Sequence, residues 1–549
     1  MKKIGTIINC SFIALLIFCS DCTTKLFNDK VIFENENIRE MLLDNSEYNF
    51  NDDQNIEIVL HLNYSFKGDY YNIENFIDEQ EVKENFRNKS SKYHISNNNM
   101  ILSTFDLKNV ESIYVSKYSP FIEIQMTKEK FKQNDFSLIN DLVKSDDVKT
   151  IYIRGIEGEN KSNLNGAYNS IGCLDIVRNS TYTGSGIKVG ILEPGIIDSD
   201  HASLANTNTV VRKVWYYNET EEEHTTKMAA IIAGTNGIAK DTTIYSVELY
   251  GNPTNEIDWL IDNDVDIINL SYGDESPTGS YSSKSAYMDY IAYTYKIIFV
   301  ASAGNTGATD NYVANPGLGY NVITCGSYNK SYDSLDSFSS YSVVSGPRKP
   351  TLVAPGSGIF IKDFSGSNDG TSISSAITSG SIALLLEKDP SLKLYPEKII
   401  ALLTANSVTL DDYKITNSLN DKIGSGKLNV SNTLNNVKNN YLIVNNNTSS
   451  NTYIYDKSIY LEEGQTLKAS IAWLAYATGD AEDTKFTDYD LHLYNSSSTY
   501  LAYSSSTNSN IELIEYTANS GGYYTLKVKQ YSSKSTSSSE NIALAYSIF

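Results

Sequence analysis

Between residues 187 and 324 the chain repeats one pattern: a short continuous apolar run, a polar or glycine-containing turn, and a helical pattern. The first run reads IKVGIL, from Ile187 to Leu192, and ends in the turn Glu193-Pro194-Gly195. Short apolar runs bounded by turns are typical of parallel strands buried on both faces. The other runs and helical patterns lie at Thr243–Val247, Asp266–Leu270, Ile297–Ala301, Val322–Thr324, Thr225–Ala233 and Tyr287–Tyr295. This alternation predicts an α/β domain with a doubly wound, mostly parallel sheet, whose functional loops lie at the strand carboxyl ends.

The composition changes on both sides of this region. Residues 23–160 are rich in Asn, Lys, Asp and Glu and contain strand-like runs such as Ile56–Leu62, Ser112–Val115 and Val148–Ile153. They predict a small α+β unit, either a permanent domain or a removable propeptide. Residues 161–438 contain the predicted parallel sheet. Residues 439–549 are rich in Ser, Tyr, Asn and Thr with period-two strands, which predicts an all-β sandwich.

The first 22 residues join Lys2 and Lys3 to an apolar run, Ile4 to Phe18, that is short for a membrane span. This pattern predicts an export signal, with a retained N-terminal anchor as the alternative. Cys19 follows Leu16-Ile17-Phe18, which loosely resembles a lipoprotein processing site, so a lipid anchor stays open. We therefore expect a secreted or cell-surface protein.

Charge and cysteine content exclude several other functions. The net charge of −22 argues against nucleic acid and anionic membranes as partners. Beyond the signal region only Cys173 and Cys325 remain, and their spacing allows but does not require a disulfide. Neither has an adjacent His or a CxxC partner, so we expect no metal or redox role for them.

The stretch from Gly366 to Glu387 contains a polar turn, Gly370-Thr371-Ser372, that leads directly into an apolar helical pattern. Such a turn places the Ser372 hydroxyl at a helix N-terminus, where unpaired N–H groups can stabilise a developing oxyanion. We interpret Ser372 as a nucleophile. By itself the pattern is more typical of a serine that merely caps a core helix, so the interpretation depends on other segments of the chain.

Three further polar residues fall at predicted strand or helix ends. Glu193 follows the first apolar run, and His224 begins the small-residue helix HTTKMAAIIAG. Asn305 follows the buried run IIFVASAG, and its amide could donate to an oxyanion. An acid, an imidazole and a hydroxyl at one edge of a sheet are the groups that nucleophilic catalysis requires.

In chain order these segments resemble the subtilisin-like serine proteases, the subtilase family. The nucleophile motif Gly-Thr-Ser is matched in full, and the aspartate motif is matched with Glu193 in the acid position. The matching segments are Val189–Ile196, His224–Ala230, Asn269–Gly273, Ala303–Asn305, Phe338–Ser340, Ala354–Gly356 and Gly370–Ser372.

The resemblance implies a serine endopeptidase acting through an acyl-enzyme. Ser372 would attack the peptide carbonyl, His224 would transfer the proton, and Glu193 would orient the imidazole. Asn305 would stabilise the oxyanion. An extended protein or peptide substrate would pair with the backbone of Ser271, Tyr272, Gly273, Ser302, Ala303 and Gly304. The region before the catalytic domain would be a propeptide that inhibits the enzyme until it is released.

The chain also departs from the family pattern. Glu193 replaces Asp, and one methylene moves a carboxylate by roughly 1.5 Å, which can cost about 10² in rate. Thr225 and Lys227 replace the Gly and the second His of the histidine motif. These departures favour the alternative of a catalytically impaired subtilase-fold protein that acts in binding.

We expect no cofactor. The loop at residues 234–237 is too short for the calcium loop common in the family. Asp488 and Asp490 remain candidates for calcium, although two acidic residues on a strand are more often solvated. The sequence therefore identifies no calcium site.

Overall fold

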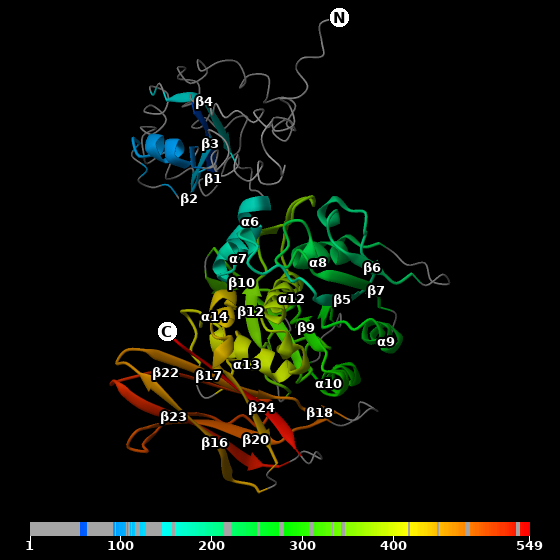
Figure 1. The fold of residues 1–549 in the computed structure, drawn as a ribbon. Coiled ribbons are helices and arrows are strands. Elements are labelled where there is room, and N and C mark those ends of the chain that lie inside the picture. Colours follow the sequence, from blue (N-terminus) through cyan, green and yellow to red (C-terminus); the bar gives the residue numbers. More distant parts are fainter. Residues whose placement is uncertain are drawn as a thin grey trace, which may run out of the picture. The chain divides into compact units, whose positions relative to one another are not determined.

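The chain, seen here as a computed structural model, divides into two compact units, Met1–Glu159 and Asn160–Phe549 (Figure 1). Residues 160–549 are described apart from gaps at 214–220, 250–252, 274–278, 308–311, 332, 342–345, 416–417, 447–448, 478–483 and 534–538; before residue 160 only shorter stretches are described. The predicted export signal, with Cys19, lies outside the described residues. Within the described part, no helix has both the length and the apolar character needed to span a bilayer.

The first unit contains an antiparallel sheet with the strand order β2-β3-β1-β4. Its central strand β1 pairs with β3 on one side and with β4 on the other. The sheet explains the apolar alternation of this region, because Ile122 and Ile124 of β3 are fully buried on one face. The strands are β1 (Asn55–Leu62), β2 (Ser112–Val115), β3 (Phe121–Thr127) and β4 (Val148–Gly155).

The second unit is built around a sheet with the order β11-β10-β9-β8-β5-β7-β6, in which β12 also pairs with β10. All neighbouring strands are parallel except β10 and β11. The strands are β5 (Lys188–Glu193), β6 (Thr209–Val211), β7 (Thr243–Glu248), β8 (Ile267–Leu270), β9 (Ile298–Ser302), β10 (Val322–Asn329), β11 (Ser334–Leu335) and β12 (Leu352–Pro355). The predicted doubly wound, mostly parallel sheet is confirmed.

Helices cover both faces of this sheet. On one face α8 (Glu223–Ala233) and α12 (Thr371–Lys388) share a core with Val189 and Ile191 of β5. On the other face α9 (Thr254–Asp262) and α10 (Ser283–Tyr295) pack with Leu192 of the same strand. Both faces of the strands are therefore apolar, which explains why they read as continuous apolar runs. The other helices of this domain are α6 (Asn160–Ser170), α7 (Leu174–Arg178), α13 (Pro396–Asn406) and α14 (Val430–Asn435).

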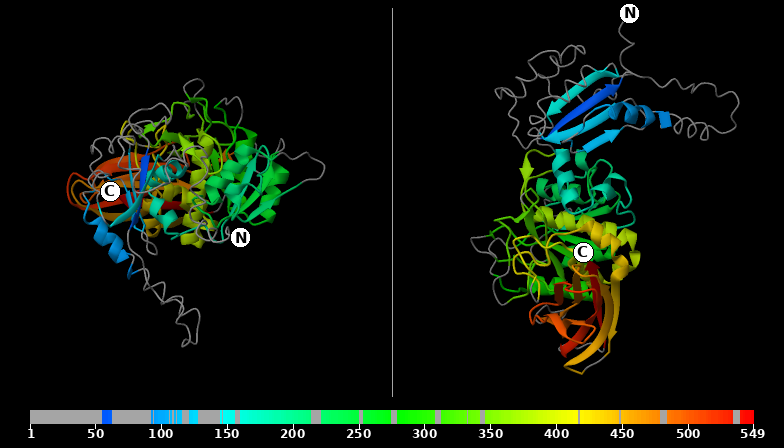
Figure 2. Two further views of the ribbon diagram at one scale, coloured as in Figure 1. Left: turned by 90° about the horizontal axis from the view of Figure 1, so that it is seen from above. Right: turned by 90° about the vertical axis from the view of Figure 1, so that its left-hand side faces the viewer.

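The C-terminal part is a sandwich of two antiparallel four-stranded sheets, with the orders β15-β24-β17-β22 and β16-β23-β20-β21 (Figure 2). The inner faces of the two sheets enclose a core that includes Trp473, Tyr489 and Leu526. The strands are β15 (Asn440–Asn445), β16 (Thr452–Leu461), β17 (Thr466–Trp473), β20 (Asp488–Asn495), β21 (Tyr500–Ser504), β22 (Ile511–Thr517), β23 (Gly522–Ser532) and β24 (Glu540–Ile548).

The outer face of the first sandwich sheet is covered by α13, so the sandwich and the α/β domain share a buried junction. Lys468 of β17 is buried in this junction with 1% of its surface exposed. Its Nζ donates to the carbonyl oxygens of Ser407 at 3.0 Å and Ser425 at 2.6 Å and lies 3.6 Å from the carboxylate of Glu515. Burial lowers the pKa of Lys468 to about 8. These directional contacts fix how the sandwich sits on the α/β domain.

Candidate active site

Glu193 is the last residue of β5, and its side chain is fully buried. One carboxylate oxygen, Oε1, accepts hydrogen bonds from Asn269 Nδ2 at 3.2 Å and from the backbone N–H of Ser271 at 3.3 Å. The other oxygen, Oε2, lies 2.9 Å from Nδ1 of His224. A buried carboxylate is costly unless it is hydrogen-bonded, and both oxygens of Glu193 have partners.

His224 is the second residue of α8, and its ring contacts Glu193 at the end of β5. Its side chain is about half exposed, at 50%, so one ring edge faces Glu193 and the ring remains accessible to solvent. Burial lowers the pKa of His224, but the hydrogen bond and the charge of Glu193 outweigh it, and the net pKa is raised above 6.5. Lys227, one turn further along α8, acts in the opposite direction because its positive charge disfavours the imidazolium.

Ser372 is the second residue of α12, directly after Thr371. Its Oγ donates to the carbonyl oxygen of Ser271 at 3.0 Å. The same residue, Ser271, donates its backbone N–H to Glu193. The end of β8 therefore connects the serine and the carboxylate. Among the described residues, the partner of the serine hydroxyl is this carbonyl and not the imidazole.

Asn305 follows β9 in an exposed turn. Its Oδ1 accepts two hydrogen bonds from Thr371, from the backbone N–H at 2.9 Å and from Oγ1 at 2.9 Å. Thr371 Oγ1 in turn accepts the backbone N–H of Gly304 at 3.1 Å. Because Thr371 holds the carbonyl oxygen of the amide, the Nδ2 group is directed away from it. That group can donate to an oxyanion at the start of α12.

The two predicted substrate segments follow neighbouring parallel strands. Ser271-Tyr272-Gly273 continues from β8, and Ser302-Ala303-Gly304 ends β9 and continues from it. A Cβ atom added at Gly273 would lie only 2.4 Å from the Cβ of Ala314, and Gly304 has a φ of +106°. Both positions therefore require glycine, and the structure brings the two segments to the same edge of the sheet as the site.

A buried polar network beneath the site was not predicted from the sequence. Asn269 of β8 donates to Glu193 and to Ser271 Oγ at 2.7 Å, and its Oδ1 accepts from Ser379 Oγ of α12 at 2.9 Å. Ser271 Oγ also contacts Ser375 Oγ at 2.8 Å. The network therefore joins β8, whose residues donate to Glu193, to α12, which carries Ser372. The only sequence signal was the Asn-x-Ser spacing within an apolar run.

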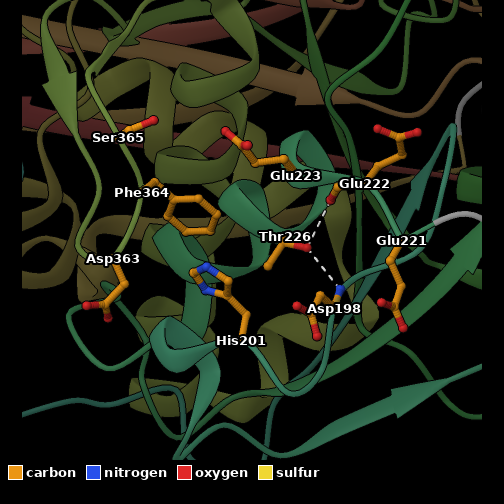
Figure 3. A pocket seen from close by; sticks show the side chains of 9 residues that line it. All are labelled: Asp198, His201, Glu221, Glu222, Glu223, Thr226, Asp363, Phe364 and Ser365. Carbon is orange, nitrogen blue, oxygen red and sulfur yellow. Dashed lines mark hydrogen bonds between the residues drawn. The ribbon is translucent and has the colours of Figure 1, made fainter.

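A pocket of about 530 Å³ lies beside the start of α8 (Figure 3). Thr226 connects two segments that line the pocket. Its Oγ1 accepts a hydrogen bond from the N–H of Asp198 and donates one to the carbonyl oxygen of Glu222, both at 2.9 Å. His201 is partly buried and stacks on Phe364 with ring centroids 4.3 Å apart. The pocket is lined by Asp198, His201, Glu221, Glu222, Glu223, Thr226, Asp363, Phe364 and Ser365.

The remaining candidates from the sequence do not form a second site. Cys173 and Cys325 are free and buried, and burial raises the pKa of the Cys325 thiol to about 12. The expectation that Asp488 and Asp490 are solvated is wrong, because each is only 5% exposed. Burial and the neighbouring Asp488 raise the pKa of Asp490 to about 6. Among the residues that the structure describes, no group of three or more His, Cys, Asp or Glu side chains could hold a metal.

A serine at a helix N-terminus, a half-exposed imidazole and a buried carboxylate at one edge of a doubly wound sheet are typical of α/β serine hydrolases. The subtilase family model matches residues 184–426. Subtilisin DY of Bacillus licheniformis is 30% identical over 239 residues, which cover 40% of this chain and 83% of that protein. Subtilisin E of Bacillus subtilis (strain 168) is 31% identical over 232 residues, covering 38% of this chain and 58% of that protein.

Among solved structures, the prenylagaramide maturation protease PagA has a TM-score of 0.40 at 21% identity, covering 47% of this chain and 98% of that chain. On the sequence matches, the chain belongs to the subtilase family. It is a serine-type endopeptidase, and its substrates are proteins.

Proposed function

We propose that this chain is an exported endopeptidase that uses a Ser372–His224–Glu193 triad, with Asn305 as an oxyanion donor. The observation that carries the proposal is the 2.9 Å contact between His224 Nδ1 and a fully buried Glu193. A buried carboxylate on Nδ1 fixes the tautomer in which Nε2 is free to accept a proton. The replacement of Asp by Glu is therefore compatible with the triad.

In the proposed reaction the Ser372 hydroxyl leaves the Ser271 carbonyl and passes its proton to His224 Nε2 as Oγ attacks the substrate carbonyl. The resulting oxyanion accepts hydrogen bonds from Asn305 Nδ2 and the Ser372 backbone N–H. The imidazolium then gives its proton to the leaving amine, and an acyl-enzyme remains. Water, deprotonated by His224, hydrolyses the ester and restores the hydroxyl.

The substrate would bind as an extended strand between Ser271-Tyr272-Gly273 and Ser302-Ala303-Gly304. Both segments leave parallel strands at the site, and backbone hydrogen bonds to such segments bind a peptide independently of its sequence. The P1 side chain would lie between them.

We further propose that residues 1–22 are an export signal, that residues 23–160 are an inhibitory propeptide, and that residues 439–549 are an accessory sandwich on the catalytic domain at 161–438. A lipid on Cys19 would attach the protein to the cell surface. N-terminal sequencing and mass spectrometry of the exported protein test these points together. A mature N-terminus near residue 160 supports a propeptide, whereas a lipidated Cys19 with an uncut chain excludes its removal.

A fluorophosphonate probe tests the enzyme assignment directly. Purified protein, freed of residues 1–159, should be labelled at Ser372 and should hydrolyse casein, and Ser372→Ala should abolish both. The second candidate is an impaired subtilase-fold binding protein, which the bond between the Ser372 hydroxyl and the Ser271 carbonyl favours. Folded protein that takes up no probe and leaves casein intact would refute the proposed triad.

A further inference from the structure

The outward face of the second sandwich sheet, β16-β23-β20-β21, carries two clusters of tyrosines, one around Tyr500 and one formed by Tyr460 and Tyr523. Strand register places Tyr494 between Thr525 and Tyr500, and places Tyr460 opposite Tyr523. All of the group except Tyr494 are more than a third exposed. We call this surface the tyrosine face, and define it by Tyr453, Tyr460, Tyr494, Tyr500, Tyr503 and Tyr523. The sheet that carries it lies on the side of the sandwich away from α13 (Figure 1).

Contacts between the side chains hold much of the tyrosine face in place. Tyr500 stacks on Tyr503 with ring centroids 5.6 Å apart, and it meets the edges of Tyr494 and His492 at 5.3 Å each. The hydroxyl of Tyr453 contacts Tyr494 Oη at 2.8 Å and His492 Nδ1 at 3.0 Å. Rings already held in position lose little conformational entropy when a ligand binds. Exposed aromatic surface organised in this way is typical of a binding site and not of ordinary surface.

The charges on this face cancel. Lys527 lies over the rings of Tyr453 and Tyr494 and pairs with Asp456 at 3.5 Å. Lys529 lies opposite Asp490 in the strand register. Burial and the nearby Lys529 lower the pKa of His492 to about 4, so this side chain is neutral at neutral pH. Within a chain of net charge −22, the face is a locally neutral surface.

We propose that the tyrosine face binds an uncharged polysaccharide. A sugar ring has an apolar C–H face that packs on an aromatic ring, and hydroxyls that tyrosine, lysine and aspartate side chains can hydrogen-bond. Charge complementarity selects this partner, because nucleic acid or an anionic membrane requires an excess of positive charge. A basic protein would require an excess of negative charge. Binding would hold the peptidase on a glycan-bearing surface, whether or not the proposed triad is correct.

The experiment is retention of the full chain on insoluble cellulose, chitin and starch, with bound protein measured over a concentration series. We expect saturable retention on at least one of them that does not weaken when salt is raised. The double substitution Tyr500→Ala and Tyr503→Ala should raise the half-saturation concentration at least about tenfold, the loss expected when central aromatic contacts are removed. Tyr500→Phe with Tyr503→Phe keeps the rings and should retain most of the binding.

Tyr295→Ala is the matched control, because this tyrosine is 50% exposed but belongs to α10 and not to the tyrosine face. Thermal unfolding shows whether each variant is folded. The proposal is overturned if none of the three polysaccharides retains the wild-type chain, if salt releases it, or if the folded alanine variant binds as well as wild type. It is also overturned if sedimentation shows a wild-type dimer that the alanine variant does not form, since a second copy would then occupy the face.

Discussion

Glu193→Gln tests the central claim about the site, because it keeps the shape of the side chain and removes its charge. Glu193 accepts three hydrogen bonds, from donors at 2.9, 3.2 and 3.3 Å. Glutamine has one acceptor oxygen. If that oxygen accepts from His224, the NH₂ group faces the donors of Asn269 and Ser271, and those two hydrogen bonds are lost. If the oxygen faces those donors, the NH₂ group meets Nδ1 and forces the proton onto Nε2, which then cannot accept the serine proton.

Replacing the carboxylate of a Ser-His-acid triad by an amide costs about 10⁴ in kcat, and we expect a loss of about 10³ to 10⁴ here. KM should change little, because Glu193 is fully buried and is not placed to touch substrate. The assay is steady-state hydrolysis of fluorescent casein, normalised by fluorophosphonate titration of Ser372. A kcat within about tenfold of wild type, too small for a lost triad acid, would show that another group, or none, orients His224.

Glu193→Asp is the control for this experiment. It keeps the charge but withdraws the carboxylate by roughly 1.5 Å, so we expect a loss of about 10² with the pH profile preserved. Both variants should unfold cooperatively, with the amide variant destabilised by about 1–3 kcal/mol for its unpaired buried group.

Three further results are expected. Activity should rise with pH through a midpoint above 6.5, because the pKa of His224 is raised and only the neutral imidazole accepts a proton. Lys227→Ala should move that midpoint to higher pH, because the positive charge of Lys227 lowers the pKa of His224. An unmoved midpoint would contradict this effect of Lys227. Asn305→Ala should lower kcat by about 10²–10³ with little change in KM, and a change confined to KM would exclude an oxyanion role. Lys468→Ala should lower the free energy of unfolding by about 3 kcal/mol, measured in urea, because the buried Ser407 carbonyl loses its lysine donor and the Ser425 carbonyl keeps only the Ser407 hydroxyl. An unchanged midpoint would show that these lysine contacts contribute no stability.

The parallel sheet could be predicted from the sequence because its strands are buried on both faces. The run Ile187–Leu192 corresponds to β5 (Lys188–Glu193), and Asp266–Leu270 contains β8. Shorter strands gave no such signal. β6 has three residues, none of them fully buried, and β12 ends in Pro355, so neither produces an apolar run of useful length. The junction at Lys468 also could not be predicted, because a lysine within a period-two strand indicates a solvated face.

The residues of the candidate site were found by their places at strand and helix ends, but the contacts that hold them were not. The sequence predicts only that Thr371 belongs to a turn, yet this residue fixes the amide of Asn305 through two hydrogen bonds. Asn269 and Ser379 lie 110 positions apart and meet only because β8 packs against α12. Periodicity describes local structure, and no local pattern indicates a hydrogen bond between such distant segments.

The side chain of Glu193 links the imidazole of His224 to a second strand, β8. In this chain Oε2 reaches His224 while Oε1 reaches across to β8, where the Asn269 amide and the Ser271 N–H hold it. A longer side chain has more rotamers to lose, and donors on both oxygens restrict them. Asn269 is itself held by Ser379 of α12, the helix that begins with the serine turn. The acid therefore depends on β8 and α12 as much as on its own strand, so the geometry of acid and nucleophile is set by one connected group of buried side chains.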